Sequence, residues 1–228
     1  MSKIAIAVFV KNPNLTPVKT RLAKGIGKKE AIEFYERSCQ ATQEVVAAWS
    51  KNTSPKVTIH PYWAIAEAGT KGRAPWREFP FVEQGDGDLG ARLDKVYGEL
   101  RASHDMVMLL GSDSPQIDPG LLDQAVKQSQ GADFVIGPAR DGGFYLLLGK
   151  HRVPRTIWQQ TPYSDAKTCG TLVDLLRKAG HTISMMDPLD DIDTSKELFE
   201  VKNYLAHLPS KTPGQESLIQ WIEAIQSV

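Results

Sequence analysis

The chain has 228 residues, of which 41% are hydrophobic and 24% are charged, as in a soluble globular protein of one large or two small domains. Its 27 basic and 27 acidic residues cancel, which excludes a global field that would recruit nucleic acid or an anionic membrane. The apolar run at residues 4–10 is too short to span a membrane and no signal-cleavage site follows it, so we expect a cytoplasmic protein.

Residues 3–10 are apolar and rich in β-branched side chains, which predicts a first, central strand. The loop that follows, 11–21, has two prolines and three cations, Lys11, Lys19 and Arg21. Lysine offers a point charge and arginine a bidentate fork, and both bind phosphate. The Walker A pattern is absent, so the loop is either a phosphate site of another kind or a solvated basic loop.

The next stretch predicts a helix over 28–49, a strand over 57–66 and a turn-rich excursion over 69–75. Residues 76–82 are aromatic but interrupted by Pro80, which favours an edge strand or an irregular segment. The two cysteines, Cys39 and Cys169, have neither metal-site nor CxxC spacing, and we expect both to pack on helices.

Residues 85–90 match the GxGxxG pattern of dinucleotide-binding proteins and precede a predicted helix at 91–102. Asp86 and Asp88 would bring two negative charges to a pyrophosphate, which argues against that role. Asp88 as the helix cap explains the pattern more simply, although Asp88 also stays among the candidate nucleotide-binding residues.

Residues 106–110 are all apolar and predict a strand that is buried on both faces. The strand leads into Gly111, then Asp113 between two serines, then Pro115. Because ligands of open α/β sheets bind at the carboxyl ends of the strands, we expect Asp113 at the mouth of a site. The alternative role, helix capping, suits Asp118 better.

The second half of the chain continues the alternation of strands and helices. Asp141 and two glycines lie between two predicted strands, which indicates either a close backbone approach or a tight hairpin, and the two are compatible. Asp191 and Asp193 belong to an acidic segment that follows the last predicted strand. The elements predicted here are helices at 118–130, 165–179, 195–205 and 217–225, strands at 133–138, 144–148 and 181–186, and a polar connection at 156–162.

Alternating strands and helices predict a single α/β domain with a mostly parallel sheet, over residues 1–208, followed by a C-terminal helical extension at 209–228. The polar loops then gather at one edge of the sheet. Cations together with carboxylates are what a metal–diphosphate site requires, because Mg²⁺ and Mn²⁺ take carboxylate and phosphate oxygens. We therefore expect Mg²⁺ or Mn²⁺ as the cofactor.

Five motifs in order, covering nearly the whole chain up to about residue 205, carry a family resemblance: Val-Lys-Thr-Arg-Leu (18–22), Gly-Asp-Leu-Gly-Ala-Arg-Leu (87–93), Gly-Ser-Asp-Ser-Pro (111–115), Gly-Pro-Ala-Arg-Asp-Gly-Gly-Phe-Tyr (137–145) and Asp-Ile-Asp-Thr (191–194). The chain resembles a bacterial family of small glycosyltransferase-like proteins of unknown function, the selenodomain-associated or arsenosugar-biosynthesis transferase group. The resemblance implies a three-layer α/β/α nucleotide-diphospho-sugar transferase fold of the GT-A kind.

By the same resemblance, Lys19 and Arg21 hold the nucleotide phosphates, Asp113 binds the metal, and Asp193 or Asp191 is a second metal ligand. Lys11 is a further candidate for the nucleotide site. We expect Asp141 to position or deprotonate the acceptor hydroxyl, and Arg21 to neutralise charge as the phosphate leaves.

These residues predict a metal-dependent transferase with a nucleotide-activated donor, preferably a glycosyltransferase acting on a small-molecule acceptor. A nucleotidyltransferase that releases pyrophosphate from a nucleoside triphosphate shares the site, and the single aspartate of Ser-Asp-Ser leaves both reactions open. An NAD(P)-dependent oxidoreductase using residues 85–90 is a more distant alternative. A non-catalytic protein that assembles through its tail helix, with itself or with a partner, is another.

Overall fold

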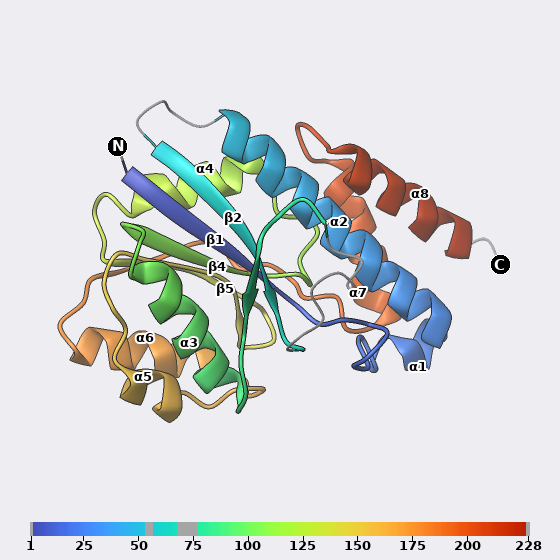
Figure 1. Ribbon diagram of the computed structural model, residues 1–228. Coiled ribbons are helices and arrows are strands. Elements are labelled where there is room, and N and C mark those ends of the chain that lie inside the picture. The colour runs from blue at the N-terminus through green and yellow to red at the C-terminus, as the bar shows by residue number, and fades with distance from the viewer. Residues whose placement is uncertain (1, 53–56, 68–76, 227–228) are drawn as a thin grey trace.

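One seven-stranded sheet crosses the middle of the molecule and carries helices on both faces (Figure 1). The computed structural model describes residues 2–52, 57–67 and 77–226. The strand order is β3-β2-β1-β4-β6-β5-β7. The strands are β1 (Ser2–Val10), β2 (Val57–Ile65), β3 (Phe81–Glu83), β4 (Met106–Gly111), β5 (Phe134–Pro138), β6 (Phe144–Gly149) and β7 (Ile183–Met185).

The sheet is parallel except at β6, which is antiparallel to both of its neighbours, β4 and β5. A short turn at 139–143 joins β5 to β6, and a connection of that length returns a strand antiparallel to its predecessor. The remaining strands place their carboxyl ends at one common edge of the sheet. This edge receives the basic loop, the Asp113 turn and the acidic segment.

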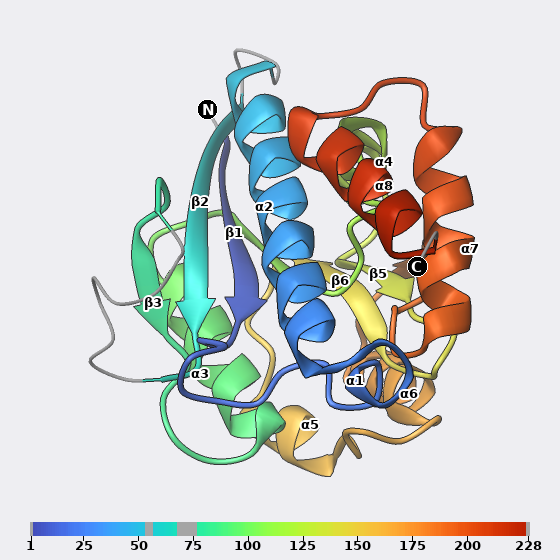
Figure 2. The same ribbon diagram turned by 90° about the vertical axis from the view of Figure 1, so that its right-hand side faces the viewer.

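Two groups of helices cover the two faces of the sheet, as Figures 1 and 2 show. α3 (Leu89–Arg101), α5 (Arg155–Gln160) and α6 (Thr168–Lys178) lie on one face. α2 (Lys28–Asn52) and α4 (Pro119–Gln128) lie on the other face. α7 (Ser195–Ala206) and α8 (Pro213–Gln226) lie beyond these two helices, farther from the sheet. The short α1 (Ala23–Ile26) precedes α2 in the chain. The predicted three-layer α/β/α fold with a mostly parallel sheet is confirmed.

The core consists of one apolar cluster on each face of the sheet and a third among the helices. In β4, Met108 and Leu110 belong to the cluster on the α2 side, and Val107 and Leu109 to the cluster on the α3 side. All four side chains are buried, so the prediction of a strand buried on both faces is confirmed. Such a strand has little freedom to move, and the turn that follows it is rigidly placed.

The third cluster fixes the C-terminal helices against α2. Phe34 of α2 packs with Leu198 of α7 and with Leu218 and Ile222 of α8. The apolar face predicted for the tail helix is therefore a packing surface within this chain. The division into a domain at 1–208 and an extension at 209–228 stays a prediction.

Two local predictions differ from the structure. The polar connection expected at 156–162 is wrong, because α5 (Arg155–Gln160) occupies most of it and buries Ile157 and Trp158. The four-residue α1 was not expected. The turn-rich excursion predicted at 69–75 lies outside the described residues. Within those residues, no helix combines the length and the apolar character that crossing a membrane requires.

Candidate functional site

Three loops meet at the carboxyl edge of the sheet. The basic loop 11–21 leaves β1, and the turn 112–118 leaves β4. Phe9 of β1 pairs in register with Gly111 of β4, so these two loops start side by side. The acidic segment 187–194 follows β7 and reaches the same place, because Lys19 contacts both Asp113 and Asp193.

Lys19 connects the three loops through its ammonium group. Its Nζ lies 3.2 Å from Asp113 Oδ1 and 3.6 Å from Asp193 Oδ1, and it donates a 2.8 Å hydrogen bond to the carbonyl of Ile192. The Lys19 side chain is only 4% exposed. A buried ammonium with two carboxylates and a carbonyl around it is held in one orientation.

The charge of Lys19 is set by a competition between burial and its neighbours. Burial works to lower the pKa of Lys19, but the carboxylates of Asp113 and Asp193 outweigh it and raise the pKa above its ordinary value. The lysine therefore stays protonated at neutral pH. Its backbone adopts φ +47°, in the left-handed region that side chains other than glycine rarely occupy. Such strain is common where the surrounding structure holds a functional residue.

The second cation, Arg21, pairs with Asp193, since its Nη1 lies 2.7 Å from Asp193 Oδ2. The position of Asp193 follows from the helix that begins just after it. Glu197 accepts hydrogen bonds of 2.7 Å from the backbone N–H groups of Asp193 and Thr194, and Thr194 caps α7. This capping box is visible in the sequence as Thr-Ser-Lys-Glu (194–197). Because Asp193 directly precedes the box, the pattern is a sequence signal for the fixed position of Asp193.

The turn that carries Asp113 is held by two helices on the same side of the sheet. Ser38 of α2 donates a 2.6 Å hydrogen bond to the carbonyl of Ser112. Gln215 of α8 donates to the carbonyl of Pro115 at 3.0 Å. These contacts fix the backbone on both sides of the aspartate, so the carboxylate is presented by a rigid turn.

Asp191 is the carboxylate with the most perturbed ionisation. Burial and the charges of Asp113 and Asp141 raise its pKa to about 6, against the opposing influence of Lys19 and of a 3.1 Å hydrogen bond from Ser114 Oγ. Burial and the neighbouring negative charges therefore outweigh the stabilising effect of Lys19 and Ser114 on the ionised form of Asp191.

Asp141 reaches the site from the β5–β6 turn, where its Oδ1 accepts a 2.8 Å hydrogen bond from the backbone N–H of Gly143. Gly142 has φ +99°, and a Cβ on it would lie 2.3 Å from the backbone of Ala166. The predicted close backbone approach is confirmed: the glycine lets the Asp141 turn pack directly on the segment before α6.

Two cavities open at this edge, and they differ in charge. One, of about 370 Å³, contains the three cations of the basic loop and is called the basic cavity; it is lined by Phe9, Val10, Lys11, Pro17, Val18, Lys19, Thr20, Arg21, Tyr35, Gln84, Leu89, Gly111, Ser112, Asp113 and Asp193. Its size and its cations suit a nucleoside diphosphate.

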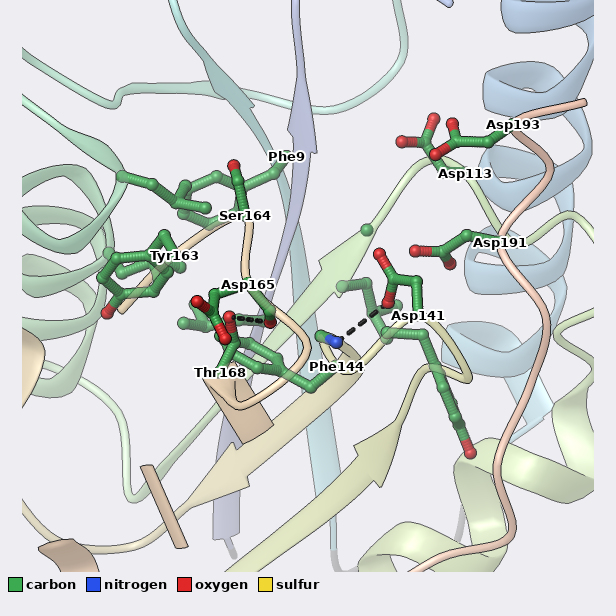
Figure 3. A pocket seen from close by; sticks show the side chains of 17 residues that line it. Phe9, Asp113, Asp141, Phe144, Tyr163, Ser164, Asp165, Thr168, Asp191 and Asp193 are labelled. Atoms are coloured by element: carbon green, nitrogen blue, oxygen red, sulfur yellow. Dashed lines mark hydrogen bonds between the residues drawn. The ribbon is translucent and has the colours of Figure 1, made fainter. Parts of the chain in front are cut away.

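The other, of about 340 Å³, is called the acidic cavity, because the described residues of its lining include five aspartates and no lysine or arginine. It is lined by Phe9, Leu89, Leu93, Leu109, Leu110, Gly111, Asp113, Asp141, Gly143, Phe144, Tyr145, Tyr163, Ser164, Asp165, Thr168, Asp191 and Asp193. Figure 3 shows Asp113, Asp141, Asp191 and Asp193 on one side of this cavity. Tyr163, Ser164, Asp165 and Thr168 lie on the other side. The cavities share the wall that contains Asp113 and Asp193.

The site suits a divalent metal in chemistry, although the ligands are not preassembled. Oxygen ligands are what Mg²⁺ and Mn²⁺ prefer, and the raised pKa of Asp191 marks a place where added positive charge would be favourable. Within the described residues, however, no three His, Cys, Asp or Glu side chains are arranged to hold a metal ion. Asp113 and Asp193 already form ion pairs with Lys19.

The structure brings most of the predicted site residues together, at the two cavities. Asp88 stands apart from both linings and caps α3 by accepting a 2.9 Å hydrogen bond from the N–H of Ala91, as the capping interpretation predicted. A nucleotide contact for Asp88 stays a prediction. Tyr163 and Thr168 also line the acidic cavity but were not predicted as site residues, because the segment around them matches no motif.

Comparison with solved structures finds the same fold. A protein of Desulfovibrio desulfuricans G20, provisionally named a nucleotide-diphospho-sugar transferase, is 24% identical with a TM-score of 0.83, over 99% of this chain and 97% of that one. The 4-diphosphocytidyl-2C-methyl-D-erythritol synthase of Anaerococcus prevotii DSM 20548 is 10% identical with a TM-score of 0.58, over 90% and 99%. CMP:2-keto-3-deoxy-manno-octonic acid synthetase, in complex with CTP, is 15% identical with a TM-score of 0.52, over 90% and 99%. At these identities the similarity concerns the fold alone.

No curated protein matches this chain. A family profile does match, over residues 46–165, which is more than half of the chain. The matched segment contains β4, the Asp113 turn and the Asp141 turn. The chain therefore belongs to the bacterial family described as "Uncharacterized protein conserved in bacteria (DUF2064)".

Proposed function

We propose that this protein is a metal-dependent glycosyltransferase that uses a nucleotide-activated sugar as its donor. The observation that carries the proposal is the pair of adjoining cavities of opposite charge, which share Asp113 and Asp193 in their common wall. The basic cavity would hold the nucleoside diphosphate, and the acidic cavity the acceptor. The sugar would then lie at the shared wall, where the two meet.

In this proposal Lys19 and Arg21 bind the diphosphate and neutralise its charge as it leaves. Asp113 and Asp193, with Asp191 beside them, would hold Mg²⁺ or Mn²⁺. A divalent cation there would supply Lewis-acid stabilisation of the leaving diphosphate. Because Lys19 contacts both aspartates in the free protein, its ammonium has to exchange carboxylate contacts for phosphate contacts when the donor binds.

The acceptor hydroxyl would attack the anomeric carbon of the sugar. The new carbon–oxygen bond forms as the bond to the diphosphate breaks, and the hydroxyl proton passes to Asp141. One oxygen of Asp141 is held by the N–H of Gly143, which orients the carboxylate and leaves its second oxygen for the proton.

The lining of the acidic cavity favours glycosyl transfer over transfer of a nucleotide to a phosphorylated acceptor. An acceptor with a phosphate or carboxylate would face five aspartates, and among the lining residues that the structure describes there is no lysine or arginine to balance them. The cavity suits an uncharged or cationic acceptor with an apolar part that contacts Phe144 and Tyr163.

A nucleotidyltransferase is the second candidate. It is supported by the fold shared with a synthetase that is named in complex with CTP and with a 4-diphosphocytidyl-2C-methyl-D-erythritol synthase. In that reaction an acceptor oxygen attacks the α-phosphorus, and pyrophosphate leaves.

Calorimetry with a panel of nucleotides and nucleotide sugars, with and without Mn²⁺, tests the proposal. Binding of a nucleoside diphosphate and its sugar conjugate in the presence of Mn²⁺ is the expected result. Absence of binding by any nucleotide to the folded protein would rule out both candidates. Incubation with a nucleoside triphosphate and candidate acceptors separates them, because release of pyrophosphate would favour nucleotidyl transfer.

A further inference from the structure

A buried glutamine lies in the wall of the basic cavity, directly after β3. Gln84 is 4% exposed and lines this cavity together with the cations of the basic loop. Its backbone N–H donates a 2.9 Å hydrogen bond to the carbonyl of Ile65, which continues the pairing of β3 with β2 by one residue. The sheet therefore fixes the position from which this side chain starts.

The amide of Gln84 has one orientation that its surroundings allow. Its Nε2 donates to the carbonyl of Ala64 at 2.8 Å and to the carbonyl of Val10 at 3.3 Å. Carbonyl oxygens only accept hydrogen bonds, so the amide nitrogen must face them and the amide oxygen must point elsewhere. Both N–H groups are used, which leaves Oε1 as a fixed acceptor on a side chain that lines the cavity.

A fixed acceptor in this place does not suit phosphate, whose oxygens also accept. It requires a ligand group that donates. Lys11, Lys19 and Arg21 supply the positive charge of the same cavity, and Phe9 and Leu89 supply apolar surface. Leu89 is 44% exposed, as a side chain available to pack against a flat ring would be.

We propose that Gln84 Oε1 accepts a hydrogen bond from an N–H group on the edge of the nucleobase, and so helps to select the nucleotide. This inference rests on the proposed function, because it assigns the phosphates to the cations of the basic loop. The base then lies over Phe9 and Leu89, with its N–H edge directed at Gln84. Every nucleobase has an N–H group, so the selection depends on where each base places it.

The test compares wild type with Gln84→Met by calorimetry, using ADP, CDP, GDP, UDP and inorganic pyrophosphate in the presence of Mn²⁺. We expect the variant to bind the preferred diphosphate roughly 3- to 10-fold more weakly, which is the loss of one hydrogen bond. Its affinity for pyrophosphate stays within about 2-fold of wild type, and the spread of affinities among the four nucleotides narrows.

Gln128→Met is the matched control. Gln128 is a half-buried glutamine of α4 whose Oε1 accepts a 3.0 Å hydrogen bond from the hydroxyl of Ser184, and it lines neither cavity. This variant should leave nucleotide selection unchanged. Equal losses of affinity for all four nucleotides in Gln84→Met would overturn the inference, and so would an equal loss of affinity for pyrophosphate. A contact to the ribose or a purely structural role of Gln84 would give such a result.

A second measurement keeps the inference testable if Gln84→Met does not fold. Wild-type protein is titrated with the preferred nucleotide and with its analogue in which the base-edge N–H is replaced by N–CH₃. We expect at least about 10-fold weaker binding of the analogue, and equal binding would overturn the base contact. If wild type binds neither nucleotides nor pyrophosphate, the proposed function fails as well, which is a different result from loss of selection alone.

Discussion

The ammonium of Lys19 lies 3.2 Å from the carboxylate of Asp113, and the two residues come from loops that leave adjacent strands. We predict that Lys19→Met lowers the free energy of unfolding by about 1–2 kcal/mol. Breaking a fully buried pair costs about 3–5 kcal/mol, but Asp113 and Asp193 are 46% and 29% exposed and water compensates for part of the loss. Urea denaturation measures this change.

The same substitution should weaken binding of a nucleoside diphosphate about 10- to 100-fold, the effect of one charge-assisted contact. Lys24→Met is the control, because Lys24 is exposed on α1 and lines neither cavity. Equal affinity in Lys19→Met and Lys24→Met would remove Lys19 from the phosphate site.

Asp191→Asn should stabilise the protein at neutral pH. The pKa of Asp191 is raised to about 6, so the folded state holds this proton more tightly than the unfolded state. The stability that the proton provides is present below the ordinary aspartate pKa and is lost as the pH rises through about 6. The predicted gain is about 2 kcal/mol at pH 7.5, or several degrees in Tm, and close to none at pH 4. A similar gain at both pH values would contradict the assigned cause.

Gly142→Ala should destabilise the protein by more than about 2 kcal/mol. The new Cβ would meet the backbone of Ala166 at 2.3 Å, and the residue has φ +99°. Gly170→Ala is the matched control, because a Cβ there meets nothing within 4 Å and α6 should gain up to about 1 kcal/mol. Thermal denaturation compares the two, and tolerance of alanine at position 142 would mean that the turn packs differently.

Asp133 stabilises the far edge of the sheet in a manner that depends on pH. The backbone N–H and hydroxyl of Thr182 donate to its carboxylate at 2.9 and 3.0 Å, and these bonds lower its pKa. A lowered pKa contributes stability above the ordinary aspartate pKa, which is lost as the pH falls through the folded value. Asp133→Asn should therefore lower Tm at pH 6, by a difference that shrinks below pH 4. Asp174→Asn, at an exposed position of α6, should show no such trend.

Most of the helices and strands were predictable, because apolar residues that become buried recur along the sequence with the period of the element that carries them. The five apolar residues 106–110 are too few for a helix of their own and predicted a strand with two covered faces, and residues 28–49 showed an imperfect helical period. α5 was missed because it is six residues long and buries only Ile157 and Trp158, too short a pattern to show a period.

The candidate site was predictable where topology decides it. The carboxyl ends of β1 and β4 lie side by side, so the loops that carry Lys19 and Asp113 leave the sheet at neighbouring points. The cap of α7 follows directly after Asp193, whose carboxylate contacts Lys19 and Arg21. Whether Asp193 or Asp191 is the second metal ligand stays a prediction. Tyr163 could not be predicted, because it enters the acidic cavity through tertiary packing of a segment without a motif.

The most direct test of the central claim is a crystal structure of the protein soaked with Mn²⁺ and a nucleoside diphosphate. The proposal predicts diphosphate density in the basic cavity against Lys19 and Arg21, and a metal ion at Asp113 on the wall shared with the acidic cavity. Density for the nucleotide elsewhere on the molecule, or clear density for the metal away from Asp113, would contradict it.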